Sequence, residues 1–133
     1  MEQGKILAEV REVLRKALGV DEDEIEENSK LVEDLGAESV DFLDIVFRLE
    51  HKFKISIPRQ ELFPLFPEDF FDKIENNEDG RLTDDGLLVL KRLFPDLDLS
   101  QFTKDPQVSR INSLFTVKYL VDYTARKIPS VDD

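Results

Sequence analysis

The chain has 133 residues, enough for one modest hydrophobic core but not for two independent domains. Its 30 acidic residues outnumber 18 basic ones, and the net charge of −12 argues against nucleic-acid binding, because phosphates would be repelled. The absence of cysteine excludes disulfide bonds, thiolate metal sites and a cysteine nucleophile. With no signal-like N-terminus and no apolar run near the ~20 residues of a membrane span, we expect a soluble, cytoplasmic protein.

The first predicted element is an amphipathic helix over residues 3–18. Its apolar residues recur at spacings of three and four: Ile6, Leu7, Val10, Val13, Leu14, Ala17 and Leu18. Gly19 is well placed to end this helix. Residues 21–29 then carry six carboxylates around Ile25. We expect a solvated loop there and not a calcium site, because the run lacks a glycine turn and a regular series of ligands.

A loop followed by a helix is predicted over residues 31–53. The loop has apolar anchors at Leu31, Val32 and Leu35 around Gly36. From Ser39 the spacing becomes helical, with one stripe of Val40, Leu43, Val46 and Phe47 and a second of Phe42, Ile45, Leu49 and Phe53. The Ser39 hydroxyl therefore stands at a helix start, where unpaired N–H groups and the positive dipole end favour an attached phosphate. By itself, such a serine would be an ordinary helix N-cap.

This stretch resembles the signature of the acyl carrier protein family, a Leu-x-x-Asp-Leu-Gly-Ala-Asp-Ser-Leu run followed by an acidic helix and an Ile-Pro. The matching residues are Leu31, Asp34-Leu35-Gly36-Ala37, Glu38-Ser39-Val40, Asp41, Asp44, Leu49-Glu50, Phe53 and Ile57-Pro58. Glu38 and Val40 replace the usual Asp and Leu but keep the charge and the apolar character. The resemblance implies that Ser39 carries 4′-phosphopantetheine through a phosphodiester, in a site completed by Asp34, Gly36, Glu38 and Val40. Acyl groups would then be held as thioesters on the terminal thiol.

The same resemblance implies a docking surface for enzymes. An outward acidic set on the Ser39 helix is predicted to bind partners with basic patches: Glu38, Asp41, Asp44 and Glu50. The expected partners are a phosphopantetheinyl transferase, which draws on coenzyme A, and enzymes that load, elongate or transfer acyl groups. The protein itself is expected to be a monomeric carrier and not an enzyme, because no general base accompanies Ser39. His51, the single histidine, is expected at the surface, and no metal site is predicted.

Residues 59–110 interrupt the resemblance and hold six of the ten phenylalanines: Phe63, Phe66, Phe70, Phe71, Phe94 and Phe102. We expect a helical hairpin, with a short helix over 68–76, a turn at 76–80 and a second helix over 84–94. Thr83 would cap the second helix, which would bury Leu87, Leu88, Leu90 or the stem of Lys91, and Phe94. An EF-hand over 75–86 is disfavoured, because Gly86 stands where the bidentate glutamate belongs. Residues 95–110 are expected to be irregular, with anchors at Leu97, Leu99 and Phe102.

A last helix is predicted over residues 115–128 and is similar to the last helix of acyl carrier proteins. Thr116 would be its N-cap, and its buried stripe would be Val117, Leu120, Val121, Thr124 and Ile128. We therefore expect an all-α fold, an acyl-carrier-protein-like bundle of three long helices plus short helices, with an extra helical-hairpin insert. The chain 1–133 would form a single carrier domain, with its core at 1–58 and 111–128 and a frayed tail at 129–133.

The predicted function is to carry acyl thioesters on Ser39 to biosynthetic enzymes, in fatty acid or specialised lipid synthesis. The alternatives are a non-acylated interaction module of the same fold, a peptidyl or polyketide carrier, and a calcium-responsive protein. The phenylalanine-rich insert would either enlarge the apolar interior for long or bulky acyl groups or form a small core of its own.

Overall fold

The structure is a computed structural model that describes residues 2–58, 60–64, 74, 76 and 78–128. Its α-helices are α1 (Gln3–Leu18), α2 (Ser39–Phe53), α4 (Asp84–Leu93) and α5 (Val117–Lys127). Short 3-10 helices lie at Glu22–Glu24, Phe102–Lys104 and Val108–Leu114. The described part contains isolated β-bridges but no strand, so the all-α prediction is confirmed. None of these helices is both long and apolar enough to cross a membrane.

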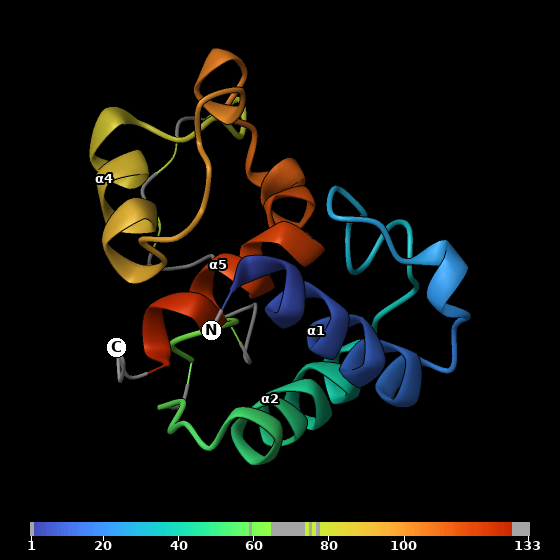
Figure 1. The fold of residues 1–133 in the computed structure, drawn as a ribbon. Coiled ribbons are helices and arrows are strands. Elements are labelled where there is room, and N and C mark those ends of the chain that lie inside the picture. The colour runs from blue at the N-terminus through green and yellow to red at the C-terminus, as the bar shows by residue number, and fades with distance from the viewer. Residues whose placement is uncertain (1, 59, 65–73, 75, 77, 129–133) are drawn as a thin grey trace.

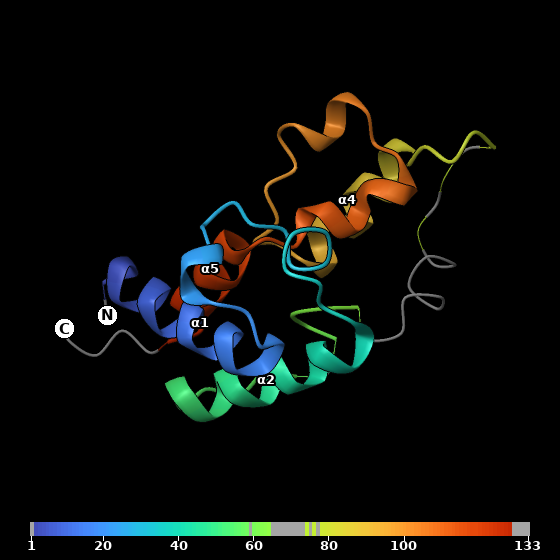
Figure 2. The same cartoon turned by 90° about the vertical axis from the view of Figure 1, so that its right-hand side faces the viewer.

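Helix α1 packs against both α2 and α5 and so holds the bundle together (Figures 1 and 2). Its buried face is Ile6, Val10, Val13 and Leu14, four of the residues predicted from the sequence. Gly19 ends the helix in the left-handed region at φ +70°, and its N–H donates to the Arg15 carbonyl. The bundle of α1, α2 and α5 confirms the predicted arrangement of long helices.

The structure shows which of its two predicted apolar stripes helix α2 exposes. Three residues of the first predicted stripe lie outside the core: Val40 is 75% exposed, Leu43 44% and Phe47 58%. The buried residues are Ile45, Val46, Leu49 and Phe53. Because α2 is apolar over two neighbouring stripes, its periodicity cannot tell which stripe α1 covers. The helix therefore presents an apolar strip at the surface, starting beside Ser39.

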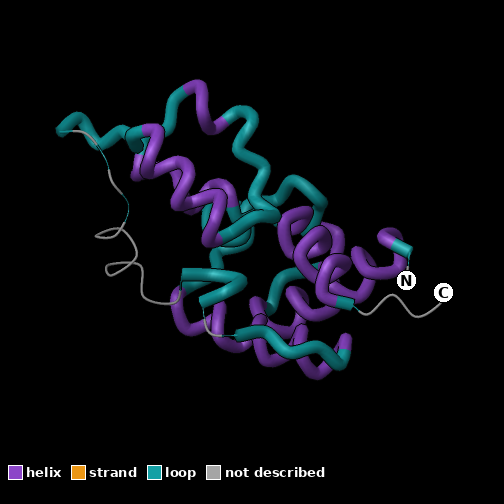
Figure 3. The backbone as a smooth tube through the Cα atoms, turned by 90° about the vertical axis from the view of Figure 1, so that its left-hand side faces the viewer, coloured by secondary structure: helices purple, strands orange, loops and turns teal. Residues whose placement is uncertain are grey.

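The part of the insert around α4 lies to one side of the bundle (Figure 3), whereas residues 60–64 lie against the bundle itself. Thr83 caps α4 as predicted, since its side-chain oxygen accepts a hydrogen bond from the Gly86 N–H at 3.1 Å. Leu90 and Phe94 are buried, but Leu88 is 62% exposed, contrary to the prediction. Leu88 lies two residues from both Gly86 and Leu90, the buried residues of α4. It therefore points to the face of the helix opposite to theirs.

The rest of the insert follows its prediction where it is described. Leu97 and Phe102 are buried anchors of the irregular 95–110 segment, and Leu99 is half-buried. Gly80 adopts φ +81° within the predicted turn. The helix predicted over 68–76 lies almost entirely outside the described residues, as do Phe66, Phe70 and Phe71.

A row of aromatic rings joins the insert to the bundle. Phe63 stacks on Phe42 of α2 with ring centroids 4.7 Å apart, and it also meets Phe115, at 6.0 Å. Phe115 in turn meets Phe94 at 5.4 Å and Tyr119 at 5.2 Å, both edge to face. These residues belong to one buried cluster that also contains the bundle core. The described phenylalanines of this row therefore pack into the bundle and not into a separate core.

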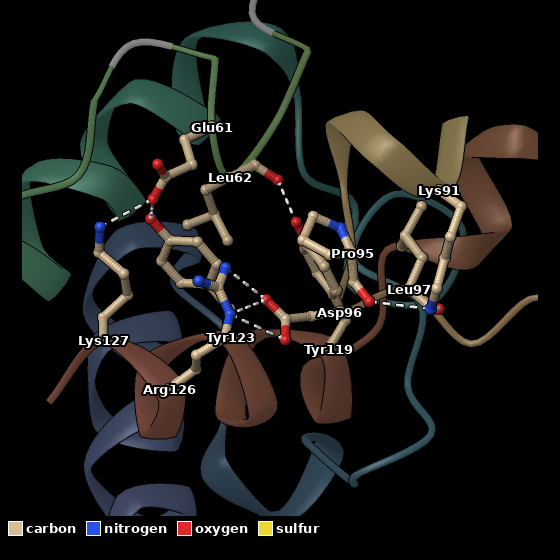
Figure 4. Close-up of polar contacts among 10 residues, drawn as sticks. All are labelled: Glu61, Leu62, Lys91, Pro95, Asp96, Leu97, Tyr119, Tyr123, Arg126 and Lys127. Carbon is tan, nitrogen blue, oxygen red and sulfur yellow. Dashed lines mark hydrogen bonds and ion pairs between the residues drawn. The ribbon is translucent and has the colours of Figure 1, made fainter. Parts of the chain in front are cut away.

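Helix α5 binds the beginning of the insert through buried polar contacts (Figure 4). The Tyr119 hydroxyl donates to the Leu62 carbonyl at 2.6 Å. The Tyr123 hydroxyl donates to the Glu61 carboxylate, which also lies 2.9 Å from Lys127 Nζ. Burial raises the pKa of both tyrosines. Burial would also raise the pKa of Glu61, but the hydrogen bonds from Tyr123 and Lys127 outweigh it and hold that pKa below its usual value.

A second anchor binds the chain that leaves α4. Arg126 Nε and Nη2 lie 2.9 and 2.8 Å from Asp96 Oδ2. Lys91 Nζ donates to the Pro95 and Leu97 carbonyls at 2.8 and 2.9 Å, which closes the end of α4 (Figure 4). Helix α5 is therefore the common support for two insert segments that are far apart in sequence.

We expect Tyr119→Phe to destabilise the protein by about 1–3 kcal/mol, because it leaves the buried Leu62 carbonyl without its donor. Urea unfolding would measure the loss. Tyr123→Phe is the matched comparison, and a smaller loss is expected because Glu61 is half-exposed and keeps Lys127 as a partner. An equal or larger loss in the Tyr123 variant would contradict this account of the Tyr119 contact.

Candidate functional site

Hydrogen bonds of the backbone fix the shape of the loop before α2. The Leu31 N–H donates to the Phe115 carbonyl at 3.1 Å, and the Ala37 N–H donates back to the Leu31 carbonyl at 2.9 Å. The Asp34 carboxylate accepts a hydrogen bond from the Lys30 N–H at 2.8 Å. Leu31 and Leu35 are buried as predicted, while Val32 is only half-buried. The loop thus has a defined shape that sets where α2 begins.

Gly36 makes the turn that leads from this loop to α2. Its φ of +73° lies in the left-handed region, and its N–H donates to the Val32 carbonyl at 3.0 Å. An added Cβ would meet no atom within 4 Å, so glycine is needed for its backbone conformation and not for space. Asp34 and Gly36, both predicted as site residues, therefore shape the loop.

Gly36→Ala is expected to destabilise the protein by about 1 kcal/mol through backbone strain alone. Thermal unfolding would measure this loss. Gly4→Ala in α1 is the matched control, since Gly4 also has open space around it but lies in a helix, where alanine is favoured. A Gly36 variant as stable as the wild type would contradict the role assigned to its conformation.

Ser39 is the first residue of α2 and is exposed. Glu38, not Ser39, occupies the N-cap position, and its N–H donates to Asp41 Oδ2 at 2.8 Å. Within the described part of the chain, the Ser39 hydroxyl has no hydrogen-bond partner. The ordinary capping role considered for this serine is therefore taken by its neighbours, and its oxygen faces solvent.

These features fit an attached phosphopantetheine. The hydroxyl that would form the phosphodiester is accessible, and the first turn of a helix offers backbone N–H groups and a positive dipole end to a phosphate. Val40, the next residue along α2, is 75% exposed and would offer an apolar surface to the arm. When bound, the arm would supply the thiol that this cysteine-free chain lacks.

An apolar cleft of about 170 Å³ begins one helical turn after Ser39. On the α2 side it is lined by Leu43, Val46, Phe47 and Glu50. The other side is lined by Ile57, Pro58, Gln60, Leu62 and Phe63. Leu43 lies at position i+4 from Ser39, so the two side chains share a face of the helix. We call this space the α2 cleft. It is the described cavity that lies nearest along α2 to the predicted attachment residue.

The four acidic residues predicted to bind partners have different surroundings. Glu38 is exposed, and Asp41 is occupied with the Glu38 N–H. Asp44 pairs with Arg48 on the next turn at 3.1 Å. Glu50 accepts a hydrogen bond from the Ile57 N–H at 2.8 Å, so it holds the loop wall of the α2 cleft. This role of Glu50 was not predicted from the sequence, where a carboxylate shortly before the Ile-Pro is the local signal for it.

The other candidate residues do not gather into a second site. His51 is exposed, as expected. In the EF-hand alternative, Asp79 accepts a hydrogen bond from the Arg81 N–H at 3.2 Å, while Glu75 and Asn77 lie outside the described residues. Among the residues whose positions are given, no His, Cys, Asp or Glu side chains cluster as metal ligands would.

Comparison with known proteins finds similarity in the segment that contains the loop before α2, Ser39 and α2 itself. A family model described as "Phosphopantetheine attachment site" matches residues 8–65. The acyl carrier protein of Campylobacter lari is 42% identical over 72 residues, covering 53% of this chain and 94% of the relative. That of Campylobacter hominis is 41% identical over 73 residues, covering 54% and 92%. That of Wolinella succinogenes is 46% identical over 56 residues, covering 42% and 74%. No solved structure matches the chain significantly.

The Campylobacter relatives are thus matched over nearly their whole length, whereas this chain has additional residues. The matched family model spans the loop, α2 and most of the cleft wall. The chain therefore belongs to the acyl carrier protein family: it is a carrier and not an enzyme, holds a covalently attached 4′-phosphopantetheine, and interacts with a phosphopantetheinyl transferase and with enzymes that load and use acyl groups.

Proposed function

We propose that 4′-phosphopantetheine is attached to Ser39 and that the chain delivers acyl thioesters from this arm to enzymes of fatty acid or specialised lipid synthesis. The observation that carries the proposal is the exposed, unbonded Ser39 hydroxyl at the start of α2, one turn from an apolar cleft. In the attachment step, the Ser39 oxygen forms a phosphodiester as the pyrophosphate bond of coenzyme A breaks and the nucleotide part leaves. A separate transferase supplies the catalytic base.

The α2 cleft is the proposed resting place of the acyl chain. Leu43, Val46 and Phe47 offer apolar side chains along one wall, and each methylene buried there contributes about 0.8 kcal/mol. The Glu50 carboxylate bonds to the Ile57 N–H and keeps the opposite wall in place. A cleft on the surface, as opposed to a sealed cavity, allows the chain to leave when a partner enzyme binds.

The proposed docking surface is the exposed side of the first half of α2. It combines the acidic side chains of Glu38 and Asp44 with the exposed apolar side chains of Val40, Leu43 and Phe47. A partner with basic residues around an apolar patch would complement both features. Because exposed charges are screened beyond roughly 8 Å at physiological ionic strength, this docking should weaken as salt is added. Glu50 contributes less, since its carboxylate is committed to the loop.

We also propose that bundle and insert act as a single carrier domain. Helix α5 anchors Glu61 and Asp96 of the insert, and the ring of Phe63 stacks on α2. An independent insert would lack contacts of this kind.

Incubation with coenzyme A and a promiscuous phosphopantetheinyl transferase tests the proposed function. The chain should gain the mass of one phosphopantetheinyl group, and acyl-coenzyme A donors should add the corresponding acyl groups. A folded chain that stays at its original mass under conditions that convert a known carrier protein would overturn the proposal.

A further inference from the structure

A groove of about 330 Å³ lies between α1 and α2, which run side by side (Figure 2), and it is distinct from the α2 cleft. Its apolar lining comes from Val13 of α1, 4% exposed, and from Phe47 of α2, 58% exposed. Its other lining residues are titratable: Glu12, Lys16, Arg48, His51 and Lys52. We call this space the α1–α2 groove. It combines an apolar surface with more cationic than anionic groups.

The charge along α2 changes sign near the middle of the helix. Acidic residues stand at its cap and in its first half, and basic residues follow: Glu38, Asp41 and Asp44, then Arg48, His51, Lys52 and Lys54. Glu50 interrupts the basic half, but its carboxylate accepts the Ile57 N–H. Lys16 of α1 adds a further cation beside this half. A chain of net charge −12 thus has a local cationic surface on the helix that also carries the acidic one.

The cations of the groove have partners within the chain, and these ion pairs are open to water. The nitrogen–oxygen distances are 3.1 Å for Lys16–Glu12, 3.1 Å for Arg48–Asp44, 3.3 Å for Lys52–Glu12 and 3.6 Å for Lys52–Glu9. Every side chain in these pairs is between 29% and 49% exposed. Exposed ion pairs contribute little to stability, so the cations can exchange these partners for carboxylates of another molecule.

An exposed apolar strip lies where the acidic and the basic half of α2 meet. It consists of Val40, 75% exposed, Leu43, 44% exposed, and Phe47, 58% exposed. These side chains lie three and four residues apart and therefore share one face of the helix. Contiguous exposed apolar side chains that are flanked by charges are typical of a surface that binds another protein.

The two halves of this face are complementary to each other. Glu38 and Lys52 stand at equal spacing on either side of Ile45, and so do Leu43 and Phe47. In a two-fold pair, each surface patch meets its counterpart on the other copy. With two α2 helices antiparallel about an axis beside Ile45, Glu38 of each copy meets Lys52 of the other, and Leu43 meets Phe47. The same register brings the exposed side chain of Val40 to the α1–α2 groove of the other copy.

We propose that two copies of this chain pair through the exposed face of α2, with the helices antiparallel and Val40 of each copy in the α1–α2 groove of the other. Two chains of net charge −12 repel each other, but this repulsion is screened beyond roughly 8 Å at physiological ionic strength. The groups that meet across the pair are closer than that. The pair replaces the monomer that the sequence led us to expect.

The pair is weak and reversible. With its 15 residues, α2 is about 22 Å long and about 10 Å wide, which is small beside the roughly 800 Å² that each partner contributes to a standard interface. Pairing covers the side of α2 proposed above for enzyme docking, so a paired carrier and an enzyme-bound carrier exclude each other. This consequence rests on the proposed docking surface, whereas the pairing itself does not.

Sedimentation equilibrium at physiological ionic strength, over a series of chain concentrations, measures the pairing. We expect the apparent mass to rise from that of one chain towards that of two. Amide resonances of Val40, Phe47 and His51 should shift over the same concentrations, while those of the insert around α4 should stay unchanged.

Charge reversals test the register. Glu38→Lys and Lys52→Glu should each weaken the association about tenfold or more, because like charges then meet at two symmetric points. The double variant should restore it, since opposite charges face each other again. Lys104→Glu is the matched control: it makes the same change as Lys52→Glu at an exposed lysine of the insert, and it should leave the association unchanged.

Phe47→Ser tests the apolar strip without changing the charge, and it should abolish the pairing. A wild-type chain that stays monomeric over the whole series refutes the inference, as does a pair that persists in the Phe47 variant or a double charge variant that does not regain the association. Uptake of the phosphopantetheine arm, followed by intact mass in the same samples, tests the proposed function separately, so failure of the pairing leaves the carrier function standing.

Discussion

Replacing Ser39 by alanine is expected to abolish uptake of the phosphopantetheine arm completely, because the variant lacks the oxygen that would form the phosphodiester. The fold should be almost unaffected. Ser39 is not the N-cap of α2 and its hydroxyl contacts no other described residue, so the loss of stability should stay within about 0.5 kcal/mol. Alanine is also a favourable residue in the first turn of a helix.

The absence of cysteine gives this experiment a simple readout. Once coenzyme A and the transferase have been removed, any thiol on the purified chain must belong to the arm, and a thiol reagent can count it. Wild type should change from no thiol to one per chain, and Ser56→Ala, altered at another exposed serine, should do the same. Ser39→Ala should remain without a thiol. A thiol in the Ser39 variant would place the attachment at another residue.

Replacing Phe115 by alanine is expected to cost about 3–5 kcal/mol, the largest stability effect that we predict. The ring is 3% exposed and lies at the junction of the aromatic row, with Phe63, Phe94 and Tyr119 around it. Its removal leaves a cavity and also ends two edge-to-face contacts, each worth about 0.5–1.5 kcal/mol beyond simple burial. Because small domains are stable by only about 5–15 kcal/mol, this loss is a large share of the total stability.

Phe47→Ala is the matched control for this change. It removes the same ring from a side chain that is 58% exposed on α2, and it should alter the free energy of unfolding by no more than about 0.5–1 kcal/mol. Chemical denaturation of both variants and of wild type would measure the difference. Similar losses in the two variants would contradict the idea that the aromatic row ties the insert to the bundle.

The elements that the sequence predicted well are those defined by local patterns. The apolar repeat of α1 and the glycine after it fix both ends of that helix. Thr83 and Thr116 are short polar side chains that accept hydrogen bonds from N–H groups three residues ahead, at Gly86 and Tyr119. The loop before Ser39 was likewise recognisable from its glycine and its leucines. In each case neighbours in the sequence suffice to determine the structure.

The features that the sequence did not reveal depend on partners far along the chain. Tyr119 and Tyr123 meet Leu62 and Glu61 across 57 and 62 residues, and no local pattern indicates these pairs. The exposed face of α2 is decided by where α1 lies, because both of its stripes are apolar. The place of Phe63 in the wall of the α2 cleft depends on the same distant contacts.

The hydrogen bond from Tyr119 to the Leu62 carbonyl links one wall of the α2 cleft to the last helix. A transferase or synthase would contact residues around Ser39 and along the exposed surface of α2. The residues that position this wall of the cleft are different ones. Substitutions in α5 can therefore change this wall of the cleft without altering the exposed surface of α2.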